Sequence, residues 1–439
     1  MIGSIGGILI ALILIGIMAT LHELGHYLVG RRLGFKINTF QIFVGPKLVE
    51  WERNDITYKI CLLPLGAAVH FDGEFITGED DNSDVTINDD PGAFVNRPKW
   101  ARASVLLAGP FTNILSGVLA MFICFTIVGY RLPIISEIGQ NSQAATAGFQ
   151  VEDEIVAVDG KNIHTDLDFS AALMFKPQLT PSVVTVKRDG KNVDLKLVPE
   201  VVKRPMLGIS MTPTSDGLAE VVLVDENSNQ GNPVLAVGDV VTHIGGIPVS
   251  VENIGTVLEQ QAQDQVELTV LREDKEVNVV SKLSLIETVN PLGIQLTRST
   301  NLWRGIPYSF QYSWSVLRTT GQGLVQLIAG KLAPQDALAG PVGIVTMISG
   351  VVTDTKVSVA DKVVELLQLF ALISLSIGFT NLLPIPLLDG NQLLLLIVEG
   401  IRGKRLSYKA QSLISVIGVI LLLGLFGMAL FFDLSRLLQ

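Results

Sequence analysis

Long apolar runs separated by mixed polar sequence dominate the hydrophobic pattern of this chain. A helix needs roughly 20 apolar residues to cross a bilayer, and four stretches reach that length. They occupy residues 1–30, 103–130, 363–400 and 410–432. The pattern therefore predicts a polytopic α-helical membrane protein with four transmembrane helices.

Between the second and third apolar runs the pattern changes to short apolar segments that form an internal repeat. VEDEIVAVDGKNI, which begins at Val151, aligns with VGDVVTHIGGIPV, which begins at Val237, at an offset of 86 residues. PMLGISM and NPLGIQL recur at nearly the same offset. Short Ile/Val-rich segments bounded by Gly turns are typical of strands. We therefore predict two tandem β-rich domains, at residues 131–211 and 212–298.

Residues 31–102, after the first apolar run, read as extended segments around a turn: INTFQIFVG, then GPKLVEWERND, then ITYKICLLPLG. This order predicts a membrane-associated β-hairpin. Its edge strand is suited to pairing with an extended substrate, although a plain cytoplasmic hairpin is the simpler alternative. From Asp72 to Asp90 the chain has eight acidic residues and no basic one, which predicts a solvated loop.

Residues 299–362 contain an amphipathic segment rich in aromatic side chains. The aromatic residues are Trp303, Tyr308, Phe310, Tyr312 and Trp314. Such enrichment is typical of the interface between membrane and water. A linker helix packed on the two β-rich domains is the competing interpretation.

The composition agrees with a membrane protein and excludes other classes. Of 439 residues, 48% are hydrophobic and 17% charged, which is unlike a soluble domain. A net charge of −10 argues against a nucleic-acid partner. The two cysteines, Cys61 and Cys124, provide no disulfide framework.

Basic residues near the ends of the apolar runs predict the orientation in the membrane. They cluster after the first run, before the second, and between the third and fourth: Arg31, Arg32, Lys36; Arg97, Lys99, Arg102; Arg402, Lys404, Arg405, Lys409. These loops are expected in the cytoplasm. Both termini and the β-rich domains are then expected in the periplasm of a bacterium with two membranes. The first run lacks a basic leader and a small-residue cleavage site, so we expect it to be retained as a span.

The first apolar run ends in the motif HELGH. His22 and His26 are four residues apart, so on a helix they share one face and can hold one zinc ion, with Glu23 beside them as a candidate general base. Ionisable residues inside a span usually mark a functional site. Chance places HExxH in roughly one in a hundred chains of this length, so the motif alone is only suggestive. The other three histidines are scattered without ligand spacing.

Asp389 is the one carboxylate in the segment GFTNLLPIPLLDGNQ of the third apolar run. Because this run also enters from outside, Asp389 reaches about the depth of the histidines and is the natural third zinc ligand, in a site toward the cytoplasmic side. Pro384 and Pro386 remove backbone donors and break the helix, which is tolerated in a membrane beside a cavity or with substitute partners such as Asn381. A packing kink with an unpaired Asp is the alternative, and it is disfavoured by the high cost of a buried carboxylate.

The second run contains AGPFTN, where Gly109, Pro110 and Asn113 are helix-breaking or polar. We expect this face to pack against the first span.

These motifs together resemble the site-2 protease family of intramembrane zinc metalloproteases. The resemblance rests on HELGH, GPKL, LLPLG, AGPFTN, AGPVGI and NLLPIPLLDG, which cover nearly the whole chain. It implies His22, His26 and Asp389 as Zn²⁺ ligands and Glu23 as base, and it implies substrate-handling roles for Asn381, Pro384 and Pro386. Two stretches depart from the family pattern. This chain has LLPLGAAVH where the family tends to have LPLGGYV, and it has Asn391 and Gln392 after Gly390 where Gly and His are common in the family.

The resemblance also implies a substrate and a location. The expected activity is regulated intramembrane proteolysis of a single-span protein in the bacterial inner membrane, surrounded by lipid. The expected substrates are the membrane remnant of an anti-sigma factor in envelope stress signalling, and leftover signal peptides. The two β-rich domains resemble circularly permuted PDZ domains, whose LGI strands would capture C-terminal carboxylates. The alternative is that they bind no ligand.

Two other classes of function compete with this interpretation. A membrane metal transporter explains histidines and an aspartate in spans, but not Glu23, the hairpin or the repeated domains. A catalytically silent PDZ receptor is disfavoured by the intact HExxH motif with Asp389.

Overall fold

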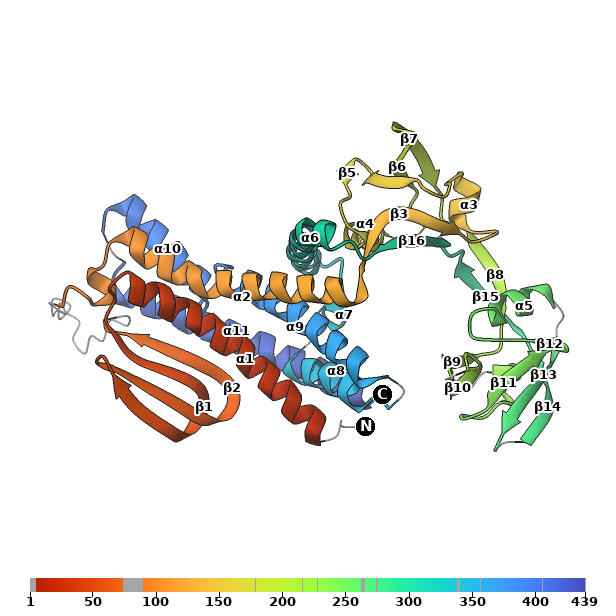
Figure 1. The fold of residues 1–439 in the computed structure, drawn as a ribbon, viewed down its shortest axis with the longest axis horizontal. Helices are drawn as coiled ribbons and strands as arrows, with labels where there is room; N and C mark the ends of the chain where they lie inside the picture. The colour runs from red at the N-terminus through yellow and green to blue at the C-terminus, as the bar shows by residue number, and fades with distance from the viewer. Residues whose placement is uncertain are drawn as a thin grey trace. The chain divides into compact units, whose positions relative to one another are not determined.

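The structure is a computed structural model that describes most of the chain (Figure 1). The described residues are 5–73, 90–177, 179–214, 216–226, 228–261, 265–273, 275–337, 340–355, 357–404 and 406–438. The predicted acidic loop lies largely at 74–89, outside the described residues. Two compact units emerge. The helical unit comprises Met1–Pro133, Ile163–Phe175 and Thr297–Gln439, and the β-rich unit comprises Ile134–Asn162 and Lys176–Leu296.

In the described part of the chain, four helices are long and apolar enough to cross a membrane, as predicted. They are α1 (Ile5–Arg32), α2 (Lys99–Val128), α9 (Val359–Asn381) and α11 (Tyr408–Leu438). The remaining α-helices of the described residues are α3 (Gln143–Ala147), α4 (Asp166–Met174), α5 (Ile254–Gln260), α6 (Leu302–Ile328), α7 (Pro334–Ala337), α8 (Pro341–Thr353) and α10 (Asp389–Arg402), and η1 (Phe94–Asn96) and η2 (Ser228–Gly231) are short 3₁₀-helices.

Within the predicted third span, 363–400, the helix is broken at the two prolines, as the sequence indicates. α9 ends at Asn381 and α10 begins at Asp389. Pro384 and Pro386 lie in the gap, where each removes a backbone donor and prevents the helix from continuing. The break places Asp389 in the first turn of a new helix, so its carboxylate is presented from a helix end.

Helix α2 packs closely against both α1 and α9 through small residues. A Cβ added to Gly25 of α1 would lie 2.4 Å from the carbonyl oxygen of Ala108, and one added to Gly117 would lie 2.6 Å from Leu375 of α9. The prediction that this face of α2 packs against the first span is confirmed. Such close approach replaces the hydrophobic driving force that is missing between helices in lipid.

The predicted hairpin is formed by β1 (Ile37–Arg53) and β2 (Ile56–Phe71), which pair antiparallel alongside α1 (Figure 1). Its turn residues, Asn54 and Asp55, have φ angles of 52° and 59°. Two consecutive positive φ angles are required by the type I′ turn, which matches the twist of the strands. At the open end, Lys36 pairs with Asp72 at 3.3 Å and with Asp90 at 2.9 Å, which joins the two ends of the acidic segment.

The amphipathic segment forms α6, and its two faces differ. One face is buried within the helical unit, where Val316 packs with Val118 of α2 and Leu375 of α9. The other face exposes Trp303 and Trp314, with 81% and 66% of their surface accessible. This division agrees with a helix at the membrane interface.

The β-strands form two larger sheets. One has the strand order β16-β3-β4-β6-β7, with β5 on β4, and the other has the order β14-β13-β11-β10-β9, with β12 on β11. Strands β8 and β15 pair with each other as a separate ribbon. The bounds are β3 Tyr130–Ile138, β4 Glu154–Val158, β5 Lys161–Asn162, β6 Ser182–Arg188, β7 Lys191–Leu197, β8 Val201–Met206, β9 Ile209–Pro213, β10 Ala219–Val224, β11 Val240–Ile244, β12 Ile247–Pro248, β13 Gln265–Arg272, β14 Lys275–Lys282, β15 Ser284–Val289 and β16 Ile294–Ser299.

The strand order differs from the predicted division at residues 211 and 212. β9, from the first LGI motif, joins the second sheet, and β16, from the second LGI motif, joins the first sheet. The chain therefore leaves the first sheet after β7, completes the second sheet, and returns along β15. A sequence repeat aligns equivalent strands but does not show which copy each strand pairs with, so the exchange was not predictable.

The same kind of buried ion pair occurs in both sheets. In the first, Arg188 donates to both carboxylate oxygens of Asp153, each at 2.7 Å. In the second, Arg272 donates to Asp239 at 2.8 and 2.7 Å. Both aspartates are 1% exposed. Burial would raise the pKa of the Asp153 carboxyl. The hydrogen bonds from the Arg188 side chain and from the backbone N–H of Gln150 outweigh this effect and hold that pKa below its usual range.

We predict that Arg188→Met destabilises the first sheet by about 2–4 kcal/mol, because it leaves a buried carboxylate without its cation. The measurement is hydrogen exchange of the β4 and β6 amides in the full chain. Lys191→Met, at an exposed position of β7, is the matched control and should have little effect. Since the folded pKa of Asp153 is lowered, its contribution is present above about pH 4 and is lost as the pH falls through the folded pKa. Equal protection in both variants would contradict the prediction.

Candidate metal centre

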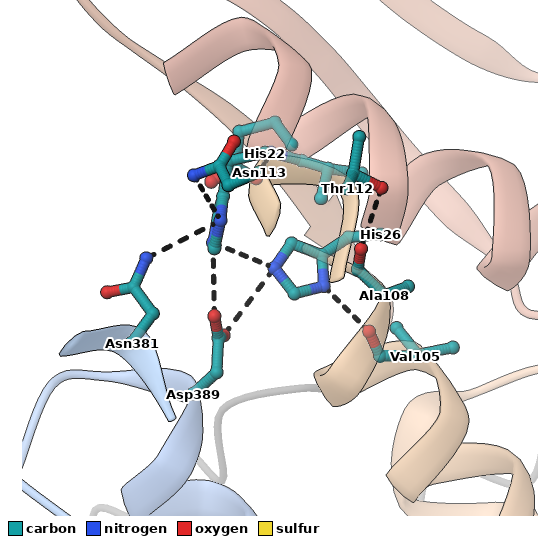
Figure 2. Close-up of polar contacts among 10 residues, drawn as sticks. His22, His26, Val105, Ala108, Thr112, Asn113, Asn381 and Asp389 are labelled. Carbon is teal, nitrogen blue, oxygen red and sulfur yellow. Dashed lines mark hydrogen bonds and ion pairs between the residues drawn. The ribbon is translucent and has the colours of Figure 1, made fainter. Parts of the chain in front are cut away.

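Three side chains converge on one point in the helical unit (Figure 2). Nε2 of His22 lies 3.2 Å from Nε2 of His26, and these nitrogens lie 3.0 and 3.5 Å from the two carboxylate oxygens of Asp389. A tetrahedral zinc ion with bonds of about 2.0–2.1 Å separates its ligand atoms by about 3.3–3.4 Å. The donor set and its spacing therefore fit Zn²⁺, with a fourth position left for water or substrate.

Each ligand is placed by its local sequence. His22 and His26 lie one turn apart on α1, and both are buried. Asp389 reaches them because α10 starts there. Behind it, a Cβ on Gly390 would lie 2.3 Å from the carbonyl oxygens of Leu382 and Leu383, so only glycine permits this turn to close so tightly.

Glu23 does not belong to this cluster of ligands in the described residues. Its Oε2 accepts a hydrogen bond from the backbone N–H of Val69, in β2, at 2.9 Å. The hairpin therefore holds one carboxylate oxygen of Glu23, and within the described part of the chain the other oxygen accepts no hydrogen bond. This arrangement is suited to a base rather than a metal ligand.

Asn381, Pro384 and Pro386 occupy the end of α9 and the break that follows it. Nδ2 of Asn381 lies 3.4 Å from Nδ1 of His22, so this residue borders the metal ligands. Pro386 packs against α11, where a Cβ on Gly418 would lie 1.8 Å from its Cβ. Of the three, Asn381 borders the candidate centre, Pro386 packs against α11, and Pro384 lies in the break between α9 and α10.

Sequence reasoning missed the contacts that α2 makes with the histidines. Nδ1 of His26 donates to the carbonyl oxygen of Val105 at 2.8 Å, and Nδ2 of Asn113 lies 3.3 Å from Nδ1 of His22 (Figure 2). The spacing of Val105, Gly109 and Asn113, at i, i+4 and i+8, indicates that all three share one face of α2, but it does not indicate which residue faces which histidine.

Comparison with known proteins agrees with this geometry. Residues 10–425 match the model of Peptidase family M50, and the chain belongs to this family. A relative in Escherichia coli, the regulator of sigma-E protease RseP, is 30% identical, with 97% of this chain and 98% of the relative covered. The Salmonella typhimurium RseP is 29% identical over the same shares. An Agrobacterium fabrum protein named as a zinc metalloprotease is 28% identical over 99% of this chain and 98% of its own length.

The protein is therefore a membrane-embedded zinc metalloendopeptidase of the site-2 protease class, and its cofactor is Zn²⁺.

We predict that the purified protein binds one zinc ion per chain and that His22→Ala or Asp389→Ala lowers this content severely, because either change removes one of three protein ligands. His164→Ala is the control, since His164 is exposed and far along the chain from the motif. Elemental analysis of the detergent-purified variants provides the measurement. Full zinc content in both ligand variants would exclude the assignment.

Proposed function

We propose that this protease cleaves single-span membrane proteins within the membrane, with His22, His26 and Asp389 as zinc ligands and Glu23 as general base. The observation that carries the proposal is the convergence of the three ligands at 3.0–3.5 Å, two from the candidate span α1 and one from the start of α10. Buried ionisable groups inside spans are expensive, so their convergence supports a dedicated chemical site.

The side chains suggest how the reaction proceeds. When bound, zinc supplies a Lewis acid for the scissile carbonyl and lowers the pKa of water at the open position. The free oxygen of Glu23 accepts the proton of the attacking water and later passes it to the leaving amine. The Val69 N–H holds the other oxygen, which fixes the direction of the base.

The hairpin is proposed to hold the substrate in an extended form. A peptide bond in an intact helix is shielded by its own hydrogen bonds, so the helix must unwind before cleavage. β1 and β2 form a two-stranded sheet, which provides strand edges for pairing with an unwound segment. Leu62, Leu63 and Leu65 of β2 are exposed, which agrees with a hairpin beside lipid or an apolar substrate. Asn381, Pro384 and Pro386, at the break, are the proposed contacts to this segment.

The positions of the basic residues support a location for the protein, and the names of its relatives support a class of substrate. The basic loops support cytoplasmic placement of the hairpin and of the loop between α10 and α11, with termini and sheets in the periplasm and the protein in the bacterial inner membrane. Because relatives are named as regulators of sigma-E, we propose the trimmed remnant of an anti-sigma factor as substrate, in envelope stress signalling. Remnant signal peptides, which are also single apolar segments in the membrane, are proposed as further substrates.

The two sheets are proposed to be PDZ domains. Gly208 and Gly293 precede the LGI strands β9 and β16, and each has a φ angle of 68°. The same left-handed glycine at the same place in both copies supports a loop of the carboxylate-binding type. The domains act either as a size filter against bulky substrates or as receptors for a newly formed C-terminus.

We predict that Glu23→Gln keeps zinc bound but slows cleavage by about 10²–10⁴-fold, because Gln is nearly isosteric and cannot accept the proton. A model single-span substrate and zinc analysis on one preparation measure both effects. Glu52→Gln, an exposed position in the hairpin, is the matched control. Cleavage at the wild-type rate in Glu23→Gln would remove Glu23 from the mechanism, and zinc flux dependent on Asp389 would favour a transporter instead.

A second prediction concerns the proposal that the sheets exclude bulky substrates by size. Residues 209–282 are inserted between paired strands, so replacing them with a short Gly-Ser linker removes the second sheet and retains β16. A filter predicts that this variant cleaves untrimmed substrate as well as the trimmed form. If it still rejects untrimmed substrate while cleaving the trimmed form, the second sheet is not the filter. Amidating the substrate C-terminus tests carboxylate capture separately.

A further inference from the structure

The two histidines differ in what holds the ring nitrogen that faces away from the metal position. Each presents Nε2 to the candidate centre, so Nδ1 carries the hydrogen and requires an acceptor. His26 has one, because its Nδ1 donates to the Val105 carbonyl oxygen at 2.8 Å. Among the described residues, Nδ1 of His22 meets two side-chain amides, those of Asn113 at 3.3 Å and Asn381 at 3.4 Å.

An amide nitrogen cannot accept a hydrogen bond from the N–H of His22, so one of these amides must present its oxygen when zinc is bound. A turn of 180° about the last side-chain bond exchanges the oxygen and nitrogen of an asparagine without moving the rest of the residue. The question is which of the two amides supplies the acceptor.

Burial distinguishes Asn113 from Asn381. Asn113 is 0% exposed, and within the described residues its Oδ1 is buried with no hydrogen-bond partner. Such an orphaned oxygen is costly, and the N–H of His22 is a donor within reach. Asn381 is only partly buried and ends α9 at the break, where its amide remains available to a substrate backbone.

The backbone around Asn113 is also held firmly. The carbonyl oxygen of Asn113 accepts hydrogen bonds from Ser116 of α2 and Ser374 of α9, each at 2.9 Å. A Cβ on Gly109 would lie 2.2 Å from Nε2 of His26, so the α2 backbone lies directly against the histidines. Because α1 and α2 run antiparallel in this contact, Val105 faces His26 and Asn113 faces His22.

We propose that Asn113 is the positioning residue for His22: its Oδ1 accepts the Nδ1 hydrogen, fixes the tautomer and orients the ring toward zinc. One face of α2 then supplies the acceptors for both histidines. This inference depends on the proposed ligand set. Losing such a partner typically lowers metal affinity or activity by about 10–100-fold.

The test compares zinc affinity of full-length Asn113→Leu, Asn113→Asp and Asn381→Leu by competition with a chelator. Asn113→Leu keeps the number and branching of the side-chain heavy atoms but has no acceptor, so its affinity should fall by about 10–100-fold. Asn113→Asp keeps an oxygen acceptor and should bind zinc about as tightly as the wild type. Asn381→Leu should retain affinity while cleavage weakens. The visible spectrum of the cobalt-substituted protein should change only in Asn113→Leu.

Two outcomes would overturn the proposal: wild-type zinc affinity and cobalt spectrum in Asn113→Leu, or a loss of zinc in Asn381→Leu alone. His22→Ala separates this failure from failure of the ligand set, because retention of zinc in that variant would reject the ligands themselves. If Asn113→Leu does not fold, Asn113→Ala adds no atoms and is judged by the same criteria. A merely structural role predicts equal loss in Asn113→Ala and Asn113→Asp.

Discussion

The need to keep one carboxylate and two imidazoles together inside apolar helices governs this structure. An isolated carboxylate away from water is unfavourable, and its cost is offset only when cations or a metal and hydrogen-bond donors surround it. Asp389 meets this condition because the two histidines of α1 lie 3.0 and 3.5 Å away. The close packing of α2 and the break before α10 both serve this single arrangement.

The break between α9 and α10 shows how an irregular backbone is tolerated at this depth. Unpaired peptide groups are expensive in lipid, so non-helical segments occur where protein or a cavity covers them. Here Leu387 adopts a positive φ of 76°, and Gly390 packs on the carbonyl oxygens of Leu382 and Leu383, just after the end of α9. The same break also turns Asp389 toward the histidines.

Features that depend on local periodicity, such as the spacing of residues on one helix, could be predicted from the sequence. Contacts between separate helices or strands could not. His22 and His26 were readable because their spacing is about one helical turn, and Asp389 because it is the one carboxylate in the apolar segment GFTNLLPIPLLDGNQ. The contact between Asn113 and His22 depends on how α1 and α2 slide past each other, which no local pattern specifies. Likewise, the LGI repeats predicted β9 and β16 as strands, but their exchange between sheets depends on long-range pairing.

The insertion of the second sheet into the first has a consequence for synthesis on the ribosome. All strands of the second sheet, β9 to β14, are contiguous and are complete once Lys282 has been made. The first sheet begins earlier but lacks its edge strand until β16 ends at Ser299. Since domains fold as units once their chain is available, the domain that starts second finishes first. The first sheet stays incomplete, with β3 lacking its neighbour β16, until the segment just before α6 has been synthesised.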